Sequence, residues 1–512
     1  MKLNKQVFIV ILFVLAVLAP FINKPFNVDD PFYIKMAQHI ILDPLRPYSF
    51  SINWSGELRD VWGKTEATFP PLIVYYLAFV IKVFGAREWI LHLFFMIFPV
   101  TAALSLYYLI KKYCQNPFLL TLTAVSAPAF LISSTSIMLD IPLAAFMLAS
   151  AAFFVYGIDG ENDNYILVSF VLAGLAILVK YSGMLLIPLY AAELIFRNKT
   201  RYLRYLAIPA LFLGLWCLHN ILIYGGIHFL RGSRQVGGGV SLHKLIAAPL
   251  FFSGAMIFPM FAYISANRKE FYAALVLSVL LFGFSYIVIG GIGTSILFSL
   301  FFGSALFFAY KTIINYLSIE RFVLIWFALA AALVLCVEPW VSGRYMLIML
   351  APSIIIAGKL MEKRYALLFA CITLVFGLVL SSADYQWARA YSGFSEYAAS
   401  RGFTPGYFTG HFGFQYYMEK KGFSALEINK PPAGPAYLIV PRYPDAQKPG
   451  RELLGRIEFI EYRKVDSVFP LLRVMDPKSH AGFYSSFWGI LPFNFSRNPL
   501  DEFLVYKIRQ AG

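Results

Sequence analysis

Two adjacent carboxylates, Asp29 and Asp30, directly follow the first hydrophobic run of the chain, within residues 28–37. A carboxylate at this point could accept a proton from a hydroxyl group as a general base. The pair could also bind a divalent cation, because hard cations prefer carboxylate oxygens. A structural interpretation is equally open: Asp30 suits the N-cap of a helix whose first residue is Pro31. If Asp30 caps that helix, Asp29 remains free for chemistry.

Three more ionisable residues stand at the ends of hydrophobic runs. Asp140 begins one run and could simply interact with the dipole of a helix. Lys180 and Arg344 could lie at a membrane interface as ordinary flanking residues. They could instead bind a phosphate, for which an ammonium and a planar guanidinium are both suited. Tyr345, next to Arg344, fits an aromatic belt at the membrane surface.

The composition indicates what must position these residues. The chain has 512 residues, of which 59% are hydrophobic and 14% charged, whereas a soluble protein carries about 25% charged residues. The net charge of +15 is spread over short Lys/Arg clusters between hydrophobic runs. Such clusters orient membrane helices, so the charge does not indicate nucleic-acid binding. We therefore predict an α-helical polytopic membrane protein.

The hydrophobic runs predict about 13 transmembrane helices of roughly 20 residues each, some of them short. They lie near residues 6–22, 89–110, 118–135, 138–157, 165–179, 183–196, 202–223, 246–266, 271–289, 293–310, 322–338, 345–358 and 365–381. With this count the basic clusters fall on one side, which the positive-inside rule makes cytoplasmic. The acidic loop 159–163 disagrees with that side. Asp29, Asp30, Glu66, Asp140, Lys180, Glu338 and Arg344 all fall on the other side.

Two regions outside the spans have their own patterns. In the first outer loop, residues 23–88, helical spacing of apolar residues predicts interfacial helices at 30–42 and 72–84. Residues 382–512 are less hydrophobic, with strand-like pieces at 436–440, 465–474 and 504–508 and a helix pattern at 411–421. We predict two parts, a transmembrane module of residues 1–381 and a small extracytoplasmic α/β domain of residues 382–512, with the N-terminus cytoplasmic.

Metal and nucleotide motifs are absent from the sequence. The four cysteines form no CxxC pair and the seven histidines no HExxH motif, so neither group predicts a metal site. No phosphate-binding or dinucleotide-binding glycine motif occurs. The metal content is unknown from the sequence, and a divalent cation at the paired acids is the one cofactor that we consider.

Five stretches together resemble a known superfamily. They are VDDPFYIKMA, FPPLIVYYLAFVIKVFG, IMLDIPLAAFML, GLAILVKYSGMLLIPL and GRYMLIMLAP, within residues 28–352. In this order they look like the GT-C superfamily of membrane glycosyltransferases. Within it they are similar to the polyprenyl-phosphate-sugar-dependent protein O-mannosyltransferases and lipid A aminoarabinose transferases.

The resemblance implies an inverting transfer of a sugar from a polyprenyl-phosphate donor, without a nucleotide sugar. Asp29 matches the catalytic base, Asp30 its support, and Asp140 a second acidic position near the acceptor or metal site. Lys180 and Arg344 match positions that could hold the lipid phosphate as it leaves. The implied acceptor is an envelope lipid, glycan or protein on the extracytoplasmic face.

One position departs from the family pattern. Phe69 stands directly before Pro70-Pro71, where family members often have His or a charged residue. Any polar contact that family members make with the side chain at this position would have to come from Lys64 or Glu66 here. Tyr345 is a further residue that could support the site.

A membrane transporter or lipid flippase is the alternative. It should show repeated halves and polar residues at mid-membrane, whereas here the ionisable residues collect at helix ends. A non-catalytic membrane scaffold is a third hypothesis, in which Asp29→Asn leaves function intact.

Overall fold

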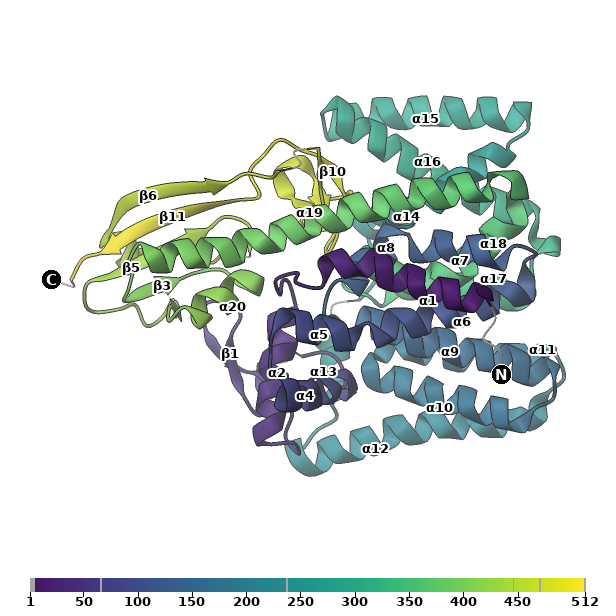
Figure 1. Cartoon of the computed structure of the whole chain (residues 1–512), viewed down its shortest axis with the longest axis horizontal. Coiled ribbons are helices and arrows are strands. Elements are labelled where there is room, and N and C mark those ends of the chain that lie inside the picture. Colours follow the sequence, from purple (N-terminus) through teal and green to yellow (C-terminus); the bar gives the residue numbers. More distant parts are fainter. Residues whose placement is uncertain (1–4, 65–66, 236–237, 445, 469–470, 511–512) are drawn as a thin grey trace.

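The computed structural model describes residues 5–64, 67–235, 238–444, 446–468 and 471–510. Helices of the first 400 residues run side by side as a bundle, and a sheet formed near the C-terminus stands at one end of it (Figure 1). The chain is an integral membrane protein, since several of these helices are long and apolar enough to cross a bilayer.

Among the described residues, six helical stretches meet the length and composition of a membrane span. They are α5 (Glu88–Phe95) with α6 (Ile97–Tyr113), α9 (Asp140–Asp159), η3 (Thr200–Leu206) with α12 (Ala207–Tyr224), α15 (Arg268–Val288), α16 (Ile292–Ile314) and α19 (Ala366–Ser400). Two bent pairs bring the number to eight: α7 (Pro117–Val125) with α8 (Pro128–Ser134), and α14 (Leu242–Met256) with η4 (Phe258–Ser265). The predicted count of about 13 is not confirmed.

The difference lies in helix length. All the predicted hydrophobic runs are helical, but the remaining ones form shorter helices. These are α1 (Lys5–Leu18), α10 (Asp163–Val179), η2 (Tyr181–Leu185) with α11 (Leu186–Phe196), α17 (Arg321–Cys336), and η6 (Arg344–Met349) with α18 (Leu350–Leu360). A hydrophobic run predicts helical structure, whereas a full crossing also needs a continuous helix of about 20 residues.

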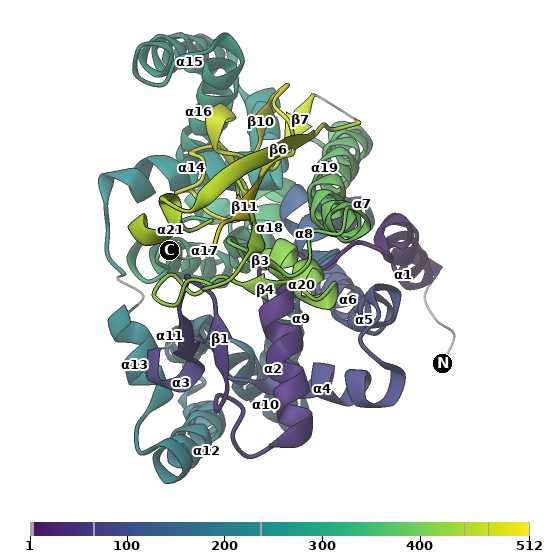
Figure 2. The ribbon, with the colours of Figure 1, turned by 90° about the vertical axis from the view of Figure 1, so that its left-hand side faces the viewer.

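The first outer loop folds as its apolar spacing predicts. α2 (Asp30–Leu42) and α4 (Leu72–Phe84) have the predicted bounds. Pro31 lies in the first turn of α2 and Pro71 directly precedes α4, which are positions that proline tolerates. Figures 1 and 2 show α2 lying across the end of the bundle, nearly perpendicular to the long helices. The loop is therefore a folded cover over this end of the membrane part.

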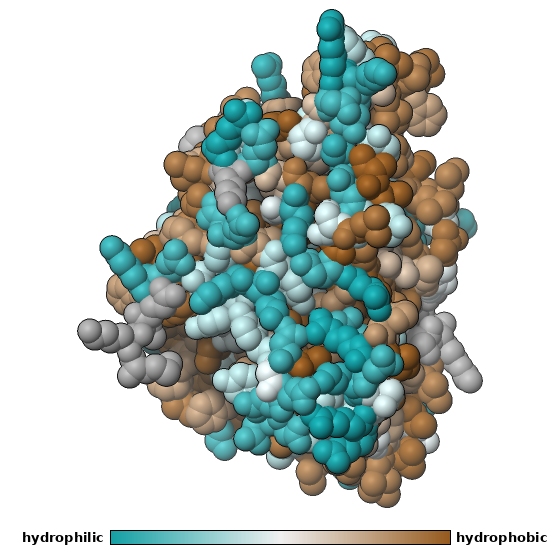
Figure 3. All heavy atoms as spheres, turned by 90° about the vertical axis from the view of Figure 1, so that its right-hand side faces the viewer, coloured by the Kyte–Doolittle hydropathy of each residue, from teal (hydrophilic) through white to brown (hydrophobic). Residues whose placement is uncertain are grey.

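The opposite end of the bundle is polar. Figure 3 shows hydrophilic residues across the middle of this face and hydrophobic residues around its margin. The acidic loop after α9 pairs here with basic residues: Asp159 with Lys112 and with Arg197, the latter at 2.5 Å, and Glu161 with Arg201 at 3.1 Å. The acids that disagreed with the charge pattern thus lie beside the basic clusters and neutralise part of them.

The C-terminal sheet has five strands in the order β4-β3-β5-β11-β6. β11 (Asp501–Ile508) pairs antiparallel with β5 (Ala436–Pro441) and β6 (Ile457–Val465), while β3 (Gly406–Phe408) runs parallel to β5 and to β4 (Ser424–Ala425). α20 (Phe412–Lys420) packs against α19. This mixed sheet with its helix agrees with a small α/β region.

One strand prediction was wrong. The third long strand is β6, and among the described residues of 465–474 only Val465 at the end of β6 and β7 (Leu472–Arg473) are in strands. β6 is an edge strand with most side chains exposed, so it lacks the alternation of apolar residues that marks a half-buried strand.

The other elements are short. They are η1 (Ala19–Phe21), β1 (Ser51–Asn53), β2 (Leu58–Asp60), α3 (Val61–Lys64), α13 (His228–Gln235), η5 (Tyr316–Ser318), η7 (Lys363–Tyr365), α21 (Arg451–Leu454), β8 (Met475–Asp476), η8 (Pro477–Ser479), β9 (Ala481–Gly482) and β10 (Asn494–Phe495). α19 passes the predicted boundary at residue 381 without a break and reaches Ser400. Membrane and C-terminal parts therefore share one helix.

Candidate functional site

Four segments bring the predicted site residues together where α2 covers the bundle. Asp29 precedes α2, Asp140 begins α9, Lys180 follows α10 and Arg344 begins η6. The Arg344 Nη1 atom lies 2.6 Å from Asp29 Oδ2, although 315 residues separate the two in sequence. We call these four residues the ionic centre.

Asp140 links the two cations of the ionic centre. Its Oδ1 atom accepts a hydrogen bond from Lys180 Nζ at 3.0 Å, and its Oδ2 atom lies 3.7 Å from Arg344 Nη1. The side chains of Asp140 and Arg344 are only 6% and 8% exposed, whereas that of Asp29 is 31% exposed. Asp140 therefore holds the cations in place, and Asp29 is the carboxylate that an incoming molecule can reach.

Tyr345 supports the cations from the side. Lys180 Nζ lies 4.2 Å from the centroid of its ring, and the Arg344 guanidinium carbon lies 5.4 Å from it. Such contacts stabilise a cation over an aromatic face. Lys180, Arg344 and Tyr345 line a small cavity together with Glu338 and Ser182.

One donor of the ionic centre has no acceptor among the described residues. Arg344 Nε is buried and makes no hydrogen bond to them. A buried donor without an acceptor is unfavourable by about 1–3 kcal/mol. An oxyanion beside Arg344 could supply that acceptor and would be attracted by both cations.

Asp30 has a structural position, unlike Asp29. Its carboxylate is fully buried and accepts backbone hydrogen bonds from Ile137 N at 2.8 Å and from Asn27 N at 3.1 Å. Burial raises the pKa of Asp30 to about 7, although Lys24 and these two hydrogen bonds act in the opposite direction. Asp30 thus joins the first outer loop to the turn before Asp140.

The predicted capping role of Asp30 was wrong. α2 begins at Asp30 itself, and Asp29 occupies the N-cap position without a side-chain capping hydrogen bond. The long-range hydrogen bond to Ile137 competes with local capping, and no local pattern reveals it.

The predicted supporting residues of the first loop are only partly described. Lys64 is the last residue of α3, and Glu66 lies outside the described residues. Phe69 is buried, and its ring centroid lies 5.1 Å from that of Tyr33 on α2. The side chain of Phe69, the residue that departs from the family pattern, therefore packs against α2.

A segment near the C-terminus holds the backbone that carries Arg344. The carbonyl oxygen of Phe483 accepts hydrogen bonds from Gly343 N at 2.7 Å and from Ser342 Oγ at 3.2 Å. Ser486 N donates to the carbonyl oxygen of Val341 at 2.8 Å, and Ser486 Oγ accepts from Val341 N at 3.2 Å. Residues 341–344 are thus fixed by a segment more than a hundred positions later.

A second buried network lies beside the ionic centre, and the sequence did not reveal it. Lys24 forms an ion pair with Asp384 on α19 and donates to Ser136 Oγ at 3.0 Å. Tyr484 donates to Asp384 at 2.9 Å. Lys24 and Asp384 also stand at ends of hydrophobic runs, so the signal that singled out Asp140 and Lys180 could have found them.

Replacing Lys24 should destabilise the protein. Lys24→Met leaves Asp384 buried without a cation, which costs about 3–5 kcal/mol for a buried pair. We expect a lower unfolding temperature in detergent, measured with Lys82→Met as the control, because Lys82 is an exposed lysine. Lys24→Met with Asp384→Asn should recover most of the loss, and a double variant no more stable than Lys24→Met would contradict the ion pair's role.

A family comparison matches one stretch of the chain. Residues 68–224 match the family described as dolichyl-phosphate-mannose-protein mannosyltransferase. The predicted GT-C resemblance is confirmed there. This mannosyltransferase-family segment runs from the residues before α4 through α12 and contains Asp140 and Lys180, whereas Asp29 and Arg344 lie outside it.

Solved structures match most of the chain at low sequence identity. ArnT from Cupriavidus metallidurans bound to undecaprenyl phosphate has a TM-score of 0.44 and 12% identity, covering 86% of this chain and 93% of that one. The Archaeoglobus fulgidus oligosaccharyltransferase with zinc and sulfate has a TM-score of 0.48 and 14% identity, covering 85% and 68%. Arabinosyltransferase EmbB from Mycobacterium smegmatis has a TM-score of 0.37 and 13% identity, covering 92% and 45%. No curated protein matches the chain in sequence.

The described part of the chain contains no group of three or more His, Cys, Asp or Glu residues that could hold a metal ion. Asp29 and Asp30 do not form a shared site, since Asp29 faces Arg344 and Asp30 accepts its hydrogen bonds from backbone amides.

Proposed function

We propose that the chain transfers a sugar from a polyprenyl-phosphate donor to an envelope lipid, glycan or protein at the extracytoplasmic membrane surface. The observation that carries this proposal is the ionic centre, in which Lys180 and Arg344 line one cavity and Arg344 Nε has no acceptor in the described part of the chain. The name of the family that matches residues 68–224 includes a lipid-phosphate sugar donor and supports the same class of donor.

The proposed reaction is a direct displacement with inversion at the anomeric carbon. Asp29 removes the proton of the acceptor hydroxyl as that oxygen forms a bond to the anomeric carbon. The bond between this carbon and the phosphate oxygen breaks, and its electron pair leaves with polyprenyl phosphate. Lys180 and Arg344 neutralise the charge that develops on the departing phosphate.

Asp29 and Arg344 are paired before the donor arrives, at 2.6 Å. In the proposed complex the donor phosphate takes over the Arg344 guanidinium, which releases the carboxylate of Asp29 for the acceptor hydroxyl. Asp140 keeps its contact with Lys180 and orients the cations. Binding of the donor thereby prepares the base.

The direct test uses the full-length protein reconstituted in vesicles. A radiolabelled sugar on polyprenyl phosphate should be transferred to material extracted from cell envelopes, and the same sugar on a nucleoside diphosphate should not. Mass spectrometry of envelope lipids and glycoproteins with the gene deleted would identify the acceptor. Equal transfer from the nucleotide sugar would contradict the proposal.

The position of Arg344 can be changed without touching its side chain. Gly343 has an ordinary helical backbone conformation, with φ −58° and ψ −35°, so Gly343→Ala introduces no backbone strain. Its Cβ atom would lie 2.4 Å from a ring carbon of Phe483, and overpacking of this kind costs about 1–3 kcal/mol. We expect a higher KM for the donor with a smaller change in kcat.

Two further variants test the cause of that effect. Phe483→Leu combined with Gly343→Ala should bring KM back toward the original value, because the smaller side chain makes room. Gly214→Ala is the matched control, since a Cβ atom there meets nothing within 4 Å. If Gly343→Ala changes KM no more than Gly214→Ala does, the C-terminal segment does not position Arg344.

A further inference from the structure

The segment that carries Asp29 contacts the C-terminal part of the chain. Phe26 N donates a hydrogen bond to the hydroxyl oxygen of Tyr417 on α20 at 2.9 Å, although 391 residues separate the two in sequence. The Tyr417 hydroxyl in turn donates to Glu88 Oε1 on α5 at 3.0 Å. Tyr417 therefore joins α20 both to the chain before α2 and to the helical bundle.

α20 also approaches the backbone of this segment closely at Gly413. A Cβ atom there would overlap with the carbonyl oxygen of Phe26 and would lie 3.1 Å from Asn27 Oδ1. The side-chain amide of Asn27 is buried and has no hydrogen-bond partner among the described residues, so packing holds this side chain in place. Any side chain in place of Gly413 would therefore have to displace the backbone of residues 26–27.

The residue after this contact, Val28, has a strained backbone. Its φ is 50°, a left-handed conformation that a β-branched residue rarely adopts. Such a conformation is unfavourable and persists only where the surrounding structure imposes it. Val28 is buried, and the two residues before it are those that α20 contacts. Packing against α20 therefore helps to impose the turn that leads to Asp29.

The other end of the segment is attached to the bundle. The Asp30 carboxylate accepts the hydrogen bonds from Ile137 N and Asn27 N. Between these contacts and those of α20, the side chain of Asp29 is 31% exposed and faces Arg344. Contacts on both sides of Asp29 thus determine where its carboxylate points.

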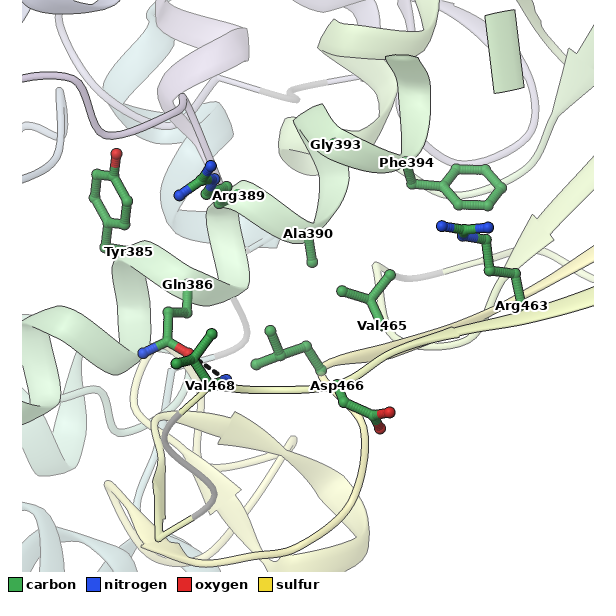
Figure 4. Close-up of a pocket in the computed structure, with 11 residues that line it drawn as sticks. Tyr385, Gln386, Arg389, Ala390, Gly393, Phe394, Arg463, Val465, Asp466 and Val468 are labelled. Atoms are coloured by element: carbon green, nitrogen blue, oxygen red, sulfur yellow. Dashed lines mark hydrogen bonds between the residues drawn. The ribbon is translucent and has the colours of Figure 1, made fainter. Parts of the chain in front are cut away.

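α20 is itself held by α19 and the C-terminal sheet. The ring centroid of Phe414 on α20 lies 6.1 Å from that of Phe394 on α19, and Phe394 stacks on Phe503 of β11 at 3.7 Å. Figure 4 shows the ring of Phe394 projecting from α19 beside Arg463 of β6. α19, α20 and the sheet therefore pack together behind the segment that carries Asp29.

We propose that α20 positions the base of the transfer reaction, with Gly413 and Tyr417 as positioning residues for Asp29. This inference rests on the proposed function, because it takes Asp29 as the base. The contacts of α20 hold the turn at Val28 and thereby direct the Asp29 carboxylate toward the acceptor hydroxyl. The C-terminal part thus acts on both sides of the reaction, on the base through α20 and on the backbone of Arg344 through the segment that follows β9.

Two variants of the full-length protein in vesicles test the proposal. Gly413→Ala should lower kcat of the folded protein by roughly 10²-fold, the loss expected for a misplacement of the base by about 1 Å. Tyr417→Phe is a milder change and should lower kcat about tenfold, because the Phe26 amide loses its acceptor. The affinity for polyprenyl phosphate should stay the same, since Lys180 and Arg344 lie on other segments.

Hydrogen–deuterium exchange gives a readout that does not depend on sugar transfer. The Asn27 amide donates to Asp30 Oδ2 at 3.1 Å, and the Asp30 amide donates to the carbonyl oxygen of Asn27 at 3.1 Å. Both amides should therefore exchange slowly in the wild type. We expect faster exchange of residues 26–30 in Gly413→Ala and in Tyr417→Phe. A role in folding alone would lower the folded fraction and leave kcat of the folded protein unchanged.

Two matched controls make the same chemical changes elsewhere. Tyr416→Phe alters the preceding residue of α20, whose hydroxyl makes no hydrogen bond with the described part of the chain. Gly393→Ala adds a Cβ atom on α19 beside an open groove (Figure 4), where it would meet nothing within 4 Å. Both controls should keep the wild-type kcat and the wild-type exchange of residues 26–30.

The outcomes separate this inference from the proposed function. Unchanged kcat in folded Gly413→Ala and Tyr417→Phe would overturn the positioning role, and so would unchanged exchange of residues 26–30 or equal losses in the two controls. Absence of sugar transfer by the wild type would contradict the proposed function instead. Faster exchange in the two variants would then still support the hold of α20 on residues 26–30.

Discussion

Asp29→Asn should lower the rate of sugar transfer by roughly 10²–10⁴-fold, the range that a general base contributes. The amide cannot accept the proton of the acceptor hydroxyl, although it fills nearly the same space. Binding of polyprenyl phosphate should persist, because Arg344 then loses its competing carboxylate and remains available to the phosphate. The measurement is kcat in vesicles, together with the affinity for polyprenyl phosphate in the same preparation.

Asp30→Asn is the matched control for this prediction. It makes the same chemical change at the neighbouring position, where the carboxylate accepts hydrogen bonds from Ile137 N and Asn27 N. We expect a stability loss of about 1–3 kcal/mol from the mismatched amide, with kcat largely kept in the folded fraction. An unchanged rate in Asp29→Asn, or a loss of kcat only in Asp30→Asn, would remove Asp29 as the base.

Arg344→Gln should reduce kcat by about 10²–10³-fold and also raise KM for the donor. This loss in kcat is the one expected when one preorganised hydrogen-bond donor to a developing oxyanion is removed. KM should rise because Arg344 contacts the phosphate of the bound donor. kcat should fall because this contact becomes stronger as the phosphate leaves. The measurement is kcat and KM for a polyprenyl-phosphate sugar, with the unfolding temperature recorded in parallel.

Arg344→Lys separates charge from geometry in the same position. Lysine keeps the positive charge but lacks the planar fork of the guanidinium, so we expect partial activity between the wild type and Arg344→Gln. Lys180 should still hold Asp140, which limits the structural damage. Full activity in Arg344→Gln would show that the phosphate is held elsewhere.

Local sequence patterns were sufficient to predict the helices near the site. The apolar spacing after Pro31 and after Pro71 predicted α2 and α4 with the observed bounds, because helix periodicity and proline at a helix start are local properties. Long hydrophobic runs likewise predicted helices throughout the membrane part.

The number of membrane crossings depends partly on bends between consecutive helices, and the sequence signals one of the two bends more clearly than the other. The 60° bend between α7 and α8 coincides with Pro128, which is a local signal. The 90° bend after α14 lies at Ile257, which has φ 65°, a left-handed conformation that a β-branched residue rarely adopts. Pro259, two residues later, is a local signal of a break in the helix. Only packing in the folded protein can impose the conformation of Ile257, so the sequence does not predict the size of the bend.

The sequence likewise predicted only part of the candidate site. Residue type and position at helix ends selected Asp29, Asp140, Lys180 and Arg344 from the sequence, since charges are unfavourable at membrane depth unless they have a partner. The sequence could not say which charges pair, or that Asp30 accepts hydrogen bonds from a backbone more than a hundred residues away.

The different surroundings of Asp29 and Asp30 could not be predicted from the sequence. Asp29 and Asp30 are chemically identical neighbours, but successive residues at the start of a helix point in different directions. One therefore meets Arg344 at a partly exposed cavity, and the other is buried against the turn before Asp140. Their roles follow from what each side chain faces, which only the packing of distant segments determines.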